Sequence, residues 1–200
     1  MVENKIDNDI YLREIEYDDK DRFDKWGKFE SPFLYGYNYN DMSDGEKEIW
    51  YLMRKKGFFR TSFAVMHRNY GFIGYISIKN MNIFRKTGLL GIVFDPNYVS
   101  MGYGTIALEQ LLDIYFNNMK YKILYLEVNS FNKRARSLYE KLGFEYYGET
   151  SERFENQDIS EEEICEKGLE NDFFFQGFSL FSKIYKMKLE RSKYEQISNK

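Results

Sequence analysis

The sequence predicts an α+β fold, in which helices flank a mixed and mainly antiparallel sheet of about seven strands. Strand-like runs follow one another closely at residues 58–67, 72–84 and 88–95, separated by the short turns RNYG and RKTG. Between residues 105 and 149, segments with helical spacing of apolar residues then alternate with strand-like runs. Tight turns favour an antiparallel meander, whereas the later alternation favours helices packed on the sheet.

The chain has 200 residues, a length that suits one domain with its own core. Hydrophobic residues make up 43% and charged residues 30%, as in ordinary globular proteins. Neither a linker nor an internal repeat divides the sequence. We therefore expect residues 1–200 to form a single domain, with a core at 10–149 and an irregular extension at 150–190.

The first elements follow from local patterns. Residues 10–15 alternate as a strand does, and Phe23 and Trp26 have helical spacing, which predicts a helix from about Asp18. Residues 30–41 are expected to form an aromatic loop. In the next segment, residues 43–57, Ser43 and Glu46 have the spacing of a capping box, which predicts a second helix that ends at Gly57.

After the meander, apolar residues at 105–119 predict an amphipathic helix. Residues 122–128 are apolar on both faces, as is typical of a central strand. Residues 132–143 predict a helix that is capped by Asn132 and ends at Gly143.

The C-terminal part carries weaker signals. We expect a strand at 144–149, one short helix within the acidic stretch 151–172, and a final strand around 184–189. The last ten residues are expected to be a frayed end.

Charge and composition exclude several classes of function. A net charge of −3 argues against a broad nucleic-acid surface. Cys165 is the single cysteine, so neither an intrachain disulfide nor a cysteine metal site can form, and we expect no metal. The single histidine, His67, is expected to be an exposed turn residue. The polar N-terminus and the lack of a long apolar run predict a cytoplasmic protein without membrane contact.

The segment SMGYGT, Ser100–Thr105, follows a strand and opens a helix. The first amides of a helix have no internal partners, and glycines such as Gly102 and Gly104 let a ligand approach the backbone closely. The loop could therefore hold a pyrophosphate with backbone amides alone. An ordinary strand–helix turn would show the same pattern.

A second segment, NSFNKRARSLYEKLGF at residues 129–144, favours the phosphate loop. Together the two segments resemble the GNAT superfamily of acetyl-CoA-dependent N-acetyltransferases, above all the branch with ribosomal-protein N-terminal and spermidine acetyltransferases. The family's Asn, Ala, Leu-Tyr and Gly-Phe signature is matched at Asn132, Ala135, Leu138–Tyr139 and Gly143–Phe144. The resemblance is strong over residues 72–149 and poor after 150.

The resemblance implies acetyl-CoA as the cosubstrate. It also implies that the fourth and fifth strands splay apart and that the pantetheine arm of acetyl-CoA inserts between them. Strand groups of Ile92, Val93 and Phe94 would then pair with that arm. The remaining implied cofactor-binding residues are Val99, Ser100, Met101, Gly102, Tyr103, Gly104, Thr105, Asn132 and Tyr139. Val99 departs from the family, which commonly has Gln or Arg at this position.

The resemblance also implies a reaction by direct attack, without a covalent enzyme intermediate. Tyr139 matches the family tyrosine that often protonates the coenzyme A sulfur. Glu127 is the first candidate for the base, because it projects from a central strand beside apolar neighbours. Asp95 and Glu149 are weaker candidates, and a water chain without any single base stays open.

The acceptor is expected to be an amine-bearing small molecule, a polyamine or a peptide. The aromatic residues Phe33, Tyr35 and Tyr37, with Phe29 and Tyr39 nearby, could stack on a cationic amine. A packed loop is the alternative. Two other functions also stay open: a degenerate domain that binds coenzyme A or a protein partner without catalysis, and an interaction protein or homodimer that uses the aromatic segment FFFQGFSLF.

Overall fold

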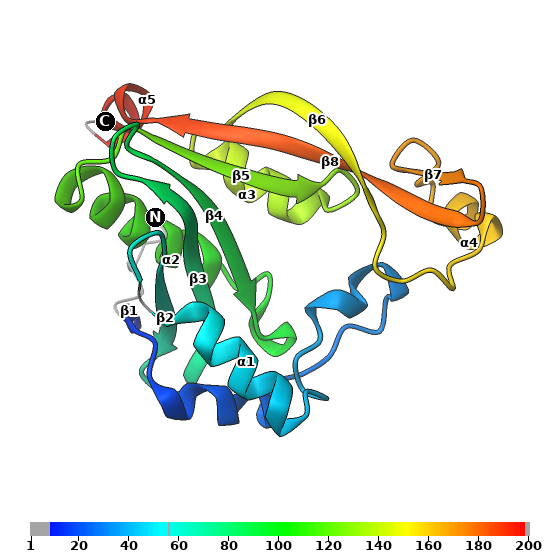
Figure 1. The fold of residues 1–200 in the computed structure, drawn as a ribbon, viewed down its shortest axis with the longest axis horizontal. Helices are drawn as coiled ribbons and strands as arrows, with labels where there is room; N and C mark the ends of the chain where they lie inside the picture. The colour runs from blue at the N-terminus through cyan, green and yellow to red at the C-terminus, as the bar shows by residue number, and fades with distance from the viewer. Residues whose placement is uncertain (1–8, 56, 199–200) are drawn as a thin grey trace, which may run out of the picture.

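A computed structural model describes residues 9–55 and 57–198 of the chain. Its centre is an eight-stranded sheet in the order β1-β2-β3-β4-β5-β8-β6, with β7 paired to β8 (Figure 1). Every neighbouring pair is antiparallel except β4 and β5, which are parallel. The expected α+β class is confirmed, with one strand more than the sequence pattern indicated.

The first elements are β1 (Ile10–Glu14), the 3₁₀ helices η1 (Tyr17–Lys25) and η2 (Pro32–Tyr37), and α1 (Asp44–Arg54). The capping box of α1 forms as expected, since Ser43 and Glu46 bond each other's backbone N–H. The expected stop at Gly57 is wrong: the helix ends at Arg54, and Gly57 makes an isolated bridge with Arg60.

The antiparallel meander is confirmed as β2 (Thr61–His67), β3 (Gly71–Asn82) and β4 (Thr87–Phe94). His67 is not the exposed turn residue that the sequence indicated. It is the last residue of β2, is 4% exposed and stacks on the Tyr70 ring at 4.3 Å. Its Nδ1 accepts a hydrogen bond from the Asn69 backbone N–H at 3.1 Å, so the ring closes this turn.

The central part contains η3 (Pro96–Tyr98), α2 (Tyr103–Asp113), the π-helical turn η4 (Ile114–Asn118), β5 (Ile123–Asn129), α3 (Lys133–Lys141) and β6 (Glu145–Arg153). Asn132 caps α3, and Gly143 follows it with a φ of 91°, both as expected. Strand β5 is central, but only its Leu124, Leu126 and Val128 face is buried. The expectation of two apolar faces is therefore wrong, because Glu127 on the other face is exposed.

The C-terminal part is more regular than its sequence indicates, with α4 (Glu161–Glu166), β7 (Phe173–Gln176), β8 (Ser179–Glu190) and α5 (Arg191–Ser198). The expected final strand at 184–189 is the second half of β8, which pairs with β5, β6 and β7. The frayed end is wrong for 191–198, because Tyr194 of α5 stacks on Phe116 at 4.9 Å. Residues 199–200 lie outside the described residues.

Helices cover both faces of the sheet. The main core joins α2 and α3 to the sheet around residues such as Ile76, Leu124 and Leu111, whereas η1 and α1 pack on the opposite face around Phe23 and Trp50. A third cluster holds the η2 segment against the β7–β8 region. This arrangement leaves β4 and β5 diverging between the covered halves (Figure 1).

Candidate functional site

Strands β4 and β5 pair over only half of their length. Thr87–Leu90 pairs with Ile123–Leu126, whereas Gly91–Phe94 keeps its pairing with β3 and has no β5 partner among the described residues. The sheet therefore opens into a wedge toward the C-terminal end of β4 (Figure 1). Backbone groups of β4 that face the wedge are available to an extended ligand.

The loop after β4 leads into the start of α2 and lies at the open end of the wedge. Ser100 and Gly102 have positive φ values of 64° and 86°, which turn the chain into the helix. Gly102 is the N-cap and has no side chain to occupy the first helical amides. The positive end of the α2 dipole therefore points into the wedge without a capping group, which favours an anion there.

One cavity of about 740 Å³ joins the wedge, the loop and α3. It brings together most of the residues that the sequence singled out. Those that line it are Tyr37, Ile92, Val93, Phe94, Val99, Ser100, Gly102, Gly104, Thr105, Glu127, Asn132 and Tyr139.

Four expected site residues lie elsewhere. Met101 is 57% exposed at the outside of the loop, and Tyr103 packs on the His67 ring at 5.2 Å. Phe33 is 5% exposed and packs against Phe173 at 5.4 Å, because η2 uses it as an anchor in the third core cluster. Tyr35 is 49% exposed and is not part of the cavity lining in the described structure.

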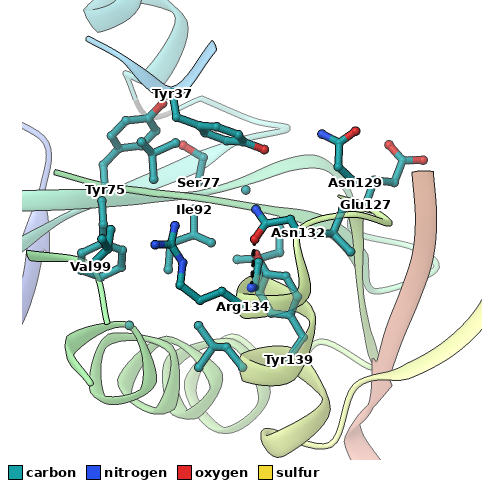
Figure 2. A pocket seen from close by; sticks show the side chains of 18 of the residues that line it. Tyr37, Tyr75, Ser77, Ile92, Val99, Glu127, Asn129, Asn132, Arg134 and Tyr139 are labelled. Carbon is teal, nitrogen blue, oxygen red and sulfur yellow. Dashed lines mark hydrogen bonds between the residues drawn. The ribbon is translucent and has the colours of Figure 1, made fainter. Parts of the chain in front are cut away.

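Tyr139 lies on α3 and faces the cavity (Figure 2). Only 7% of this residue is exposed, and burial raises the pKa of its phenol above the ordinary value. Asn132 sets the start of the same helix, because its Oδ1 accepts a hydrogen bond from the Ala135 N–H at 3.1 Å. The phenol is thus protonated at neutral pH and held by a capped helix.

Arg134 is a cavity residue that the sequence reasoning missed. Its side chain extends from the start of α3 across the cavity toward Val99 (Figure 2), and its Cζ lies 5.5 Å from the centre of the Phe29 ring. Desolvation lowers the pKa of this partly exposed guanidinium. It has no carboxylate partner among the described residues. The signal that could have found it is the unexplained cation two residues after the capping Asn132.

The opposite side of the cavity is a wall of hydroxyl and guanidinium groups that the sequence reasoning also missed. The Tyr75 hydroxyl lies 2.8 Å from the Tyr39 hydroxyl, and it accepts a hydrogen bond from Nη2 of Arg54, also at 2.8 Å. Ser77 comes next on the same face of β3. Both Tyr75 and Ser77 are buried, as are their β3 neighbours, and which face of β3 they share becomes visible only once the pairing of the strand is known. The sequence therefore carried no clear signal for this wall.

Glu127 lies across the cavity from that wall, beside Asn129 (Figure 2). The strand register pairs Glu127 with Lys186, and Lys186 with Gly148. These residues therefore share the face of the sheet opposite to the one on which Leu126 and Val128 are buried. Glu149 pairs with Tyr185 and therefore lies on the other face. Glu127 is the carboxylate that the β5 strand presents to the cavity.

Asp95 has a structural role. It is 3% exposed, and its Oδ1 accepts hydrogen bonds from the Gly27 and Asn97 backbone N–H groups at 2.9 Å each. Burial raises the pKa of Asp95, while these two backbone bonds oppose that shift. The carboxylate thus ties the end of β4 to the segment that follows η1.

A model of the Acetyltransferase (GNAT) family matches residues 18–144, well over half of the chain. The chain belongs to the GNAT acetyltransferase family. It is an N-acetyltransferase that moves the acetyl group of acetyl-CoA to an amine. The comparison with curated proteins found no match.

Solved structures with a similar fold include spermidine acetyltransferases from Vibrio cholerae. The spermidine N-acetyltransferase from Vibrio cholerae in complex with CoA and spermine is 21% identical, with a TM-score of 0.69 over 94% of this chain and 98% of that chain. A chimera of the Vibrio cholerae enzyme and hSSAT is 21% identical, with a TM-score of 0.70 over 94% and 99%. This GNAT acetyltransferase shares their fold.

Among residues 9–55 and 57–198, no group of three or more His, Cys, Asp or Glu side chains is arranged to hold a metal ion. In the same part of the chain, no helix has both the length and the apolar character needed to span a bilayer.

Proposed function

We propose that the cavity between β4, the 99–105 loop and α3 is the acetyl-transfer site of this enzyme, and that its acceptor is a primary amine on a small molecule or peptide. The observation that carries the proposal is the meeting of three features in one space. The open edge of β4, the uncapped start of α2 and the Tyr139 side chain all line the same 740 Å³ cavity.

Acetyl-CoA supplies a thioester carbonyl and a thiolate leaving group when it is bound. The residues present fit such a ligand. Gly102 and Gly104 keep side chains out of the seat for an anion, and the α2 amides favour negative charge there. Ile92, Val93 and Phe94 offer the strand edge for the pantetheine arm, and an amide there is suited to polarise the carbonyl.

Arg134 supports the phosphate end of this proposal. Val99 brings no charge to the loop, whereas the Arg134 guanidinium reaches toward Val99 from α3 (Figure 2). A guanidinium without a carboxylate partner is well suited to pair with a phosphate. We propose that Arg134 provides the positive side chain that the loop itself lacks.

Two residues are proposed to move protons. Glu127 accepts the proton that the amine gives up as its nitrogen bonds to the thioester carbon, directly or through water. Tyr139 gives its proton to the sulfur as the carbon–sulfur bond breaks, and its raised pKa keeps that proton in place beforehand. Exchange with solvent returns both side chains to their starting states. Tyr37 and Tyr75 frame the space from which the amine approaches.

The test is release of free thiol from acetyl-CoA with a panel of amines: spermidine, an unblocked peptide, an aminoglycoside and simple alkylamines. Turnover with at least one amine is expected. Tight acetyl-CoA binding without thiol release for any amine would favour the degenerate binding domain instead. In E127Q a clear loss of turnover is expected, and E149Q is the matched control because Glu149 lies on the other face of the sheet. Wild-type turnover in E127Q would assign the proton to a water chain.

The setting of the enzyme is also a proposal. We infer a cytoplasmic protein of one domain, which its use of acetyl-CoA and its single exposed cysteine, Cys165, support. We also propose that copies of the protein associate through the β7–β8 hairpin. Its side chains Phe174 and Phe178 are 43% and 106% exposed. One of the structures similar in fold is a dodecamer. Light scattering of wild type and F178S would show whether this hairpin holds copies together.

A further inference from the structure

The charges inside the cavity differ in sign from those of the whole chain. The net charge of the sequence is −3. Yet among the described residues the cavity is lined by five basic and two acidic side chains: Arg54, Arg60, Lys79, Arg134 and Lys141, against Glu127 and Glu152. Arg134 faces the loop proposed for phosphates, but Arg54, Arg60 and Lys79 lie on the α1 and β3 side, away from it. We call these three residues the basic wall. Binding of the coenzyme A phosphates does not explain their positive charge.

Strand register places Lys79, the β3 member of the basic wall, on the face of the sheet that carries Tyr75. Tyr75, Ser77 and Lys79 alternate along β3 and share one face, opposite Val93, Gly91 and Leu89 of β4. Lys79 extends along this face, because its Cε lies 3.8 Å from the position that a β-carbon on Gly91 would take. Gly91 is the first residue of β4 beyond its pairing with β5. The lysine stem therefore reaches the narrow end of the wedge, where β4 and β5 part.

Arg54 is held rigidly on the same wall. Its Nη1 donates to the Trp50 carbonyl at 3.3 Å and its Nη2 to the Tyr75 hydroxyl at 2.8 Å. The guanidinium also lies over the Tyr75 ring, with Cζ 4.6 Å from the centre. Its Nε is buried without a hydrogen-bond partner in the described residues. All of these partners are neutral, so the charge of Arg54 is not compensated.

The three cations also lack carboxylate partners. None of Arg54, Arg60 and Lys79 forms an ion pair within residues 9–55 and 57–198. The acidic residues of the cavity, Glu127 and Glu152, come from β5 and β6, the strands across the wedge. The acceptor space therefore has a positive side and a negative side. Between them lies the unpaired edge of β4, where the proposed function places the thioester.

We infer that the acceptor carries an anionic group as well as its primary amine, as an amino-carboxylate does. The amine is directed to Glu127 and the carboxylate to the basic wall, which together fix the orientation of the molecule. A polyamine has no group to offer the basic wall and brings cations close to three others. This inference rests on the proposed function, because it names the class of substrate for that site.

The test uses three acceptors with four carbons each: 4-aminobutyrate, butylamine and 1,4-diaminobutane. We expect kcat/KM for 4-aminobutyrate to exceed that for butylamine by about tenfold, the effect of one charge-assisted contact. 1,4-Diaminobutane should be the poorest of the three. Raising the salt concentration should reduce the preference, because the wall is partly exposed.

Variants then assign the preference to the wall. K79M and the double variant R60M/K79M should bring the ratio of 4-aminobutyrate to butylamine toward one. R85M is the matched control: Arg85 is an exposed basic residue in the β3–β4 turn outside the cavity, and its removal should leave the ratio as in wild type. A preference for 1,4-diaminobutane, or an unchanged ratio in R60M/K79M, would overturn the inference while the proposed function stands.

A binding experiment distinguishes failure of this inference from failure of the proposed function. Calorimetry with the product 4-acetamidobutyrate and its neutral analogue N-butylacetamide reports on the basic wall without any turnover. If 4-acetamidobutyrate binds better than N-butylacetamide and this preference is lost in R60M/K79M, the role of the basic wall is supported. This holds even if no amine is acetylated. Absence of acetylation would overturn only the proposed function. Equal binding of both compounds would overturn the inference.

Discussion

Replacement of Arg134 by methionine tests whether this side chain supplies the charge that the 99–105 loop lacks. Val99 lines the cavity without charge, and Arg134 reaches toward it from α3 (Figure 2). Methionine keeps most of the aliphatic stem and removes only the guanidinium. The change therefore isolates the electrostatic contribution to the binding of coenzyme A.

The expected size follows from the setting of the guanidinium. A hydrogen bond to a charged group contributes about 1.5–3 kcal/mol when it is well shielded from water. Arg134 is partly exposed, so solvent screening reduces this to about 1–2 kcal/mol. Binding of coenzyme A should weaken by roughly 5- to 30-fold.

The assay is calorimetric titration with two ligands, coenzyme A and pantetheine, which has the same arm without any phosphate. R134M should lose affinity for coenzyme A and keep its affinity for pantetheine. K133M is the control, because Lys133 is the exposed neighbour on α3 that does not belong to the described cavity lining. V99R in the R134M background should restore part of the lost affinity.

Two results would refute the reasoning about Arg134. Unchanged coenzyme A affinity in R134M would mean that the backbone amides of the loop suffice without any basic side chain. An equal loss for pantetheine would mean that Arg134 acts on the shape of the wedge and not on the phosphates.

Three other changes have expected outcomes. Y139F should lower turnover by about 100-fold with little loss of acetyl-CoA affinity. Because burial raises the pKa of Tyr139, its acid form persists as the pH rises, so the wild-type to Y139F rate ratio should be constant between about pH 7 and 9, and a falling ratio would contradict this role. G104D should abolish acetyl-CoA binding measured by calorimetry; G104A, which only presses on Leu138 at 3.2 Å, should retain it, and equal binding by both would contradict the anion seat. D95A should lower the free energy of unfolding in urea by about 1–2 kcal/mol and D95N by less, since Asn keeps an oxygen acceptor; equal losses would contradict the capping role.

Much of the fold was predictable because its signals are local. The capping box at Ser43, the cap at Asn132 and the glycine stop at Gly143 each depend on neighbouring residues, and all three form as the sequence indicates. The errors fall where distant contacts decide. His67 is buried by the rings of Tyr70 and Tyr103, which come from a turn and from another element.

The C-terminal segment shows the same limit. Residues 191–198 have little apolar content of their own, and α5 is held by contacts such as that of Tyr194 with Phe116. The first half of β8 was missed although β7 and β8 join at a tight turn in which Gln176 pairs with Ser179. The length of β8 is decided by its pairing with β5 and β6, which are far away in sequence. Tertiary packing overrides local preference in both cases.

The site divides in the same way. By itself, the sequence determined the turn at residues 99–105 that opens α2, the α3 cap and the cavity position of Tyr139, because each belongs to a motif whose spacing is contiguous. Only the tertiary structure decided that Phe33 is a core anchor, that Arg134 faces the loop, and that a basic wall stands across from Glu127. The physical reason is strand register. A strand presents alternate residues to opposite faces. The side chains that share the wedge are therefore known only once the pairing of β3 with β4, and the point where β4 separates from β5, are known.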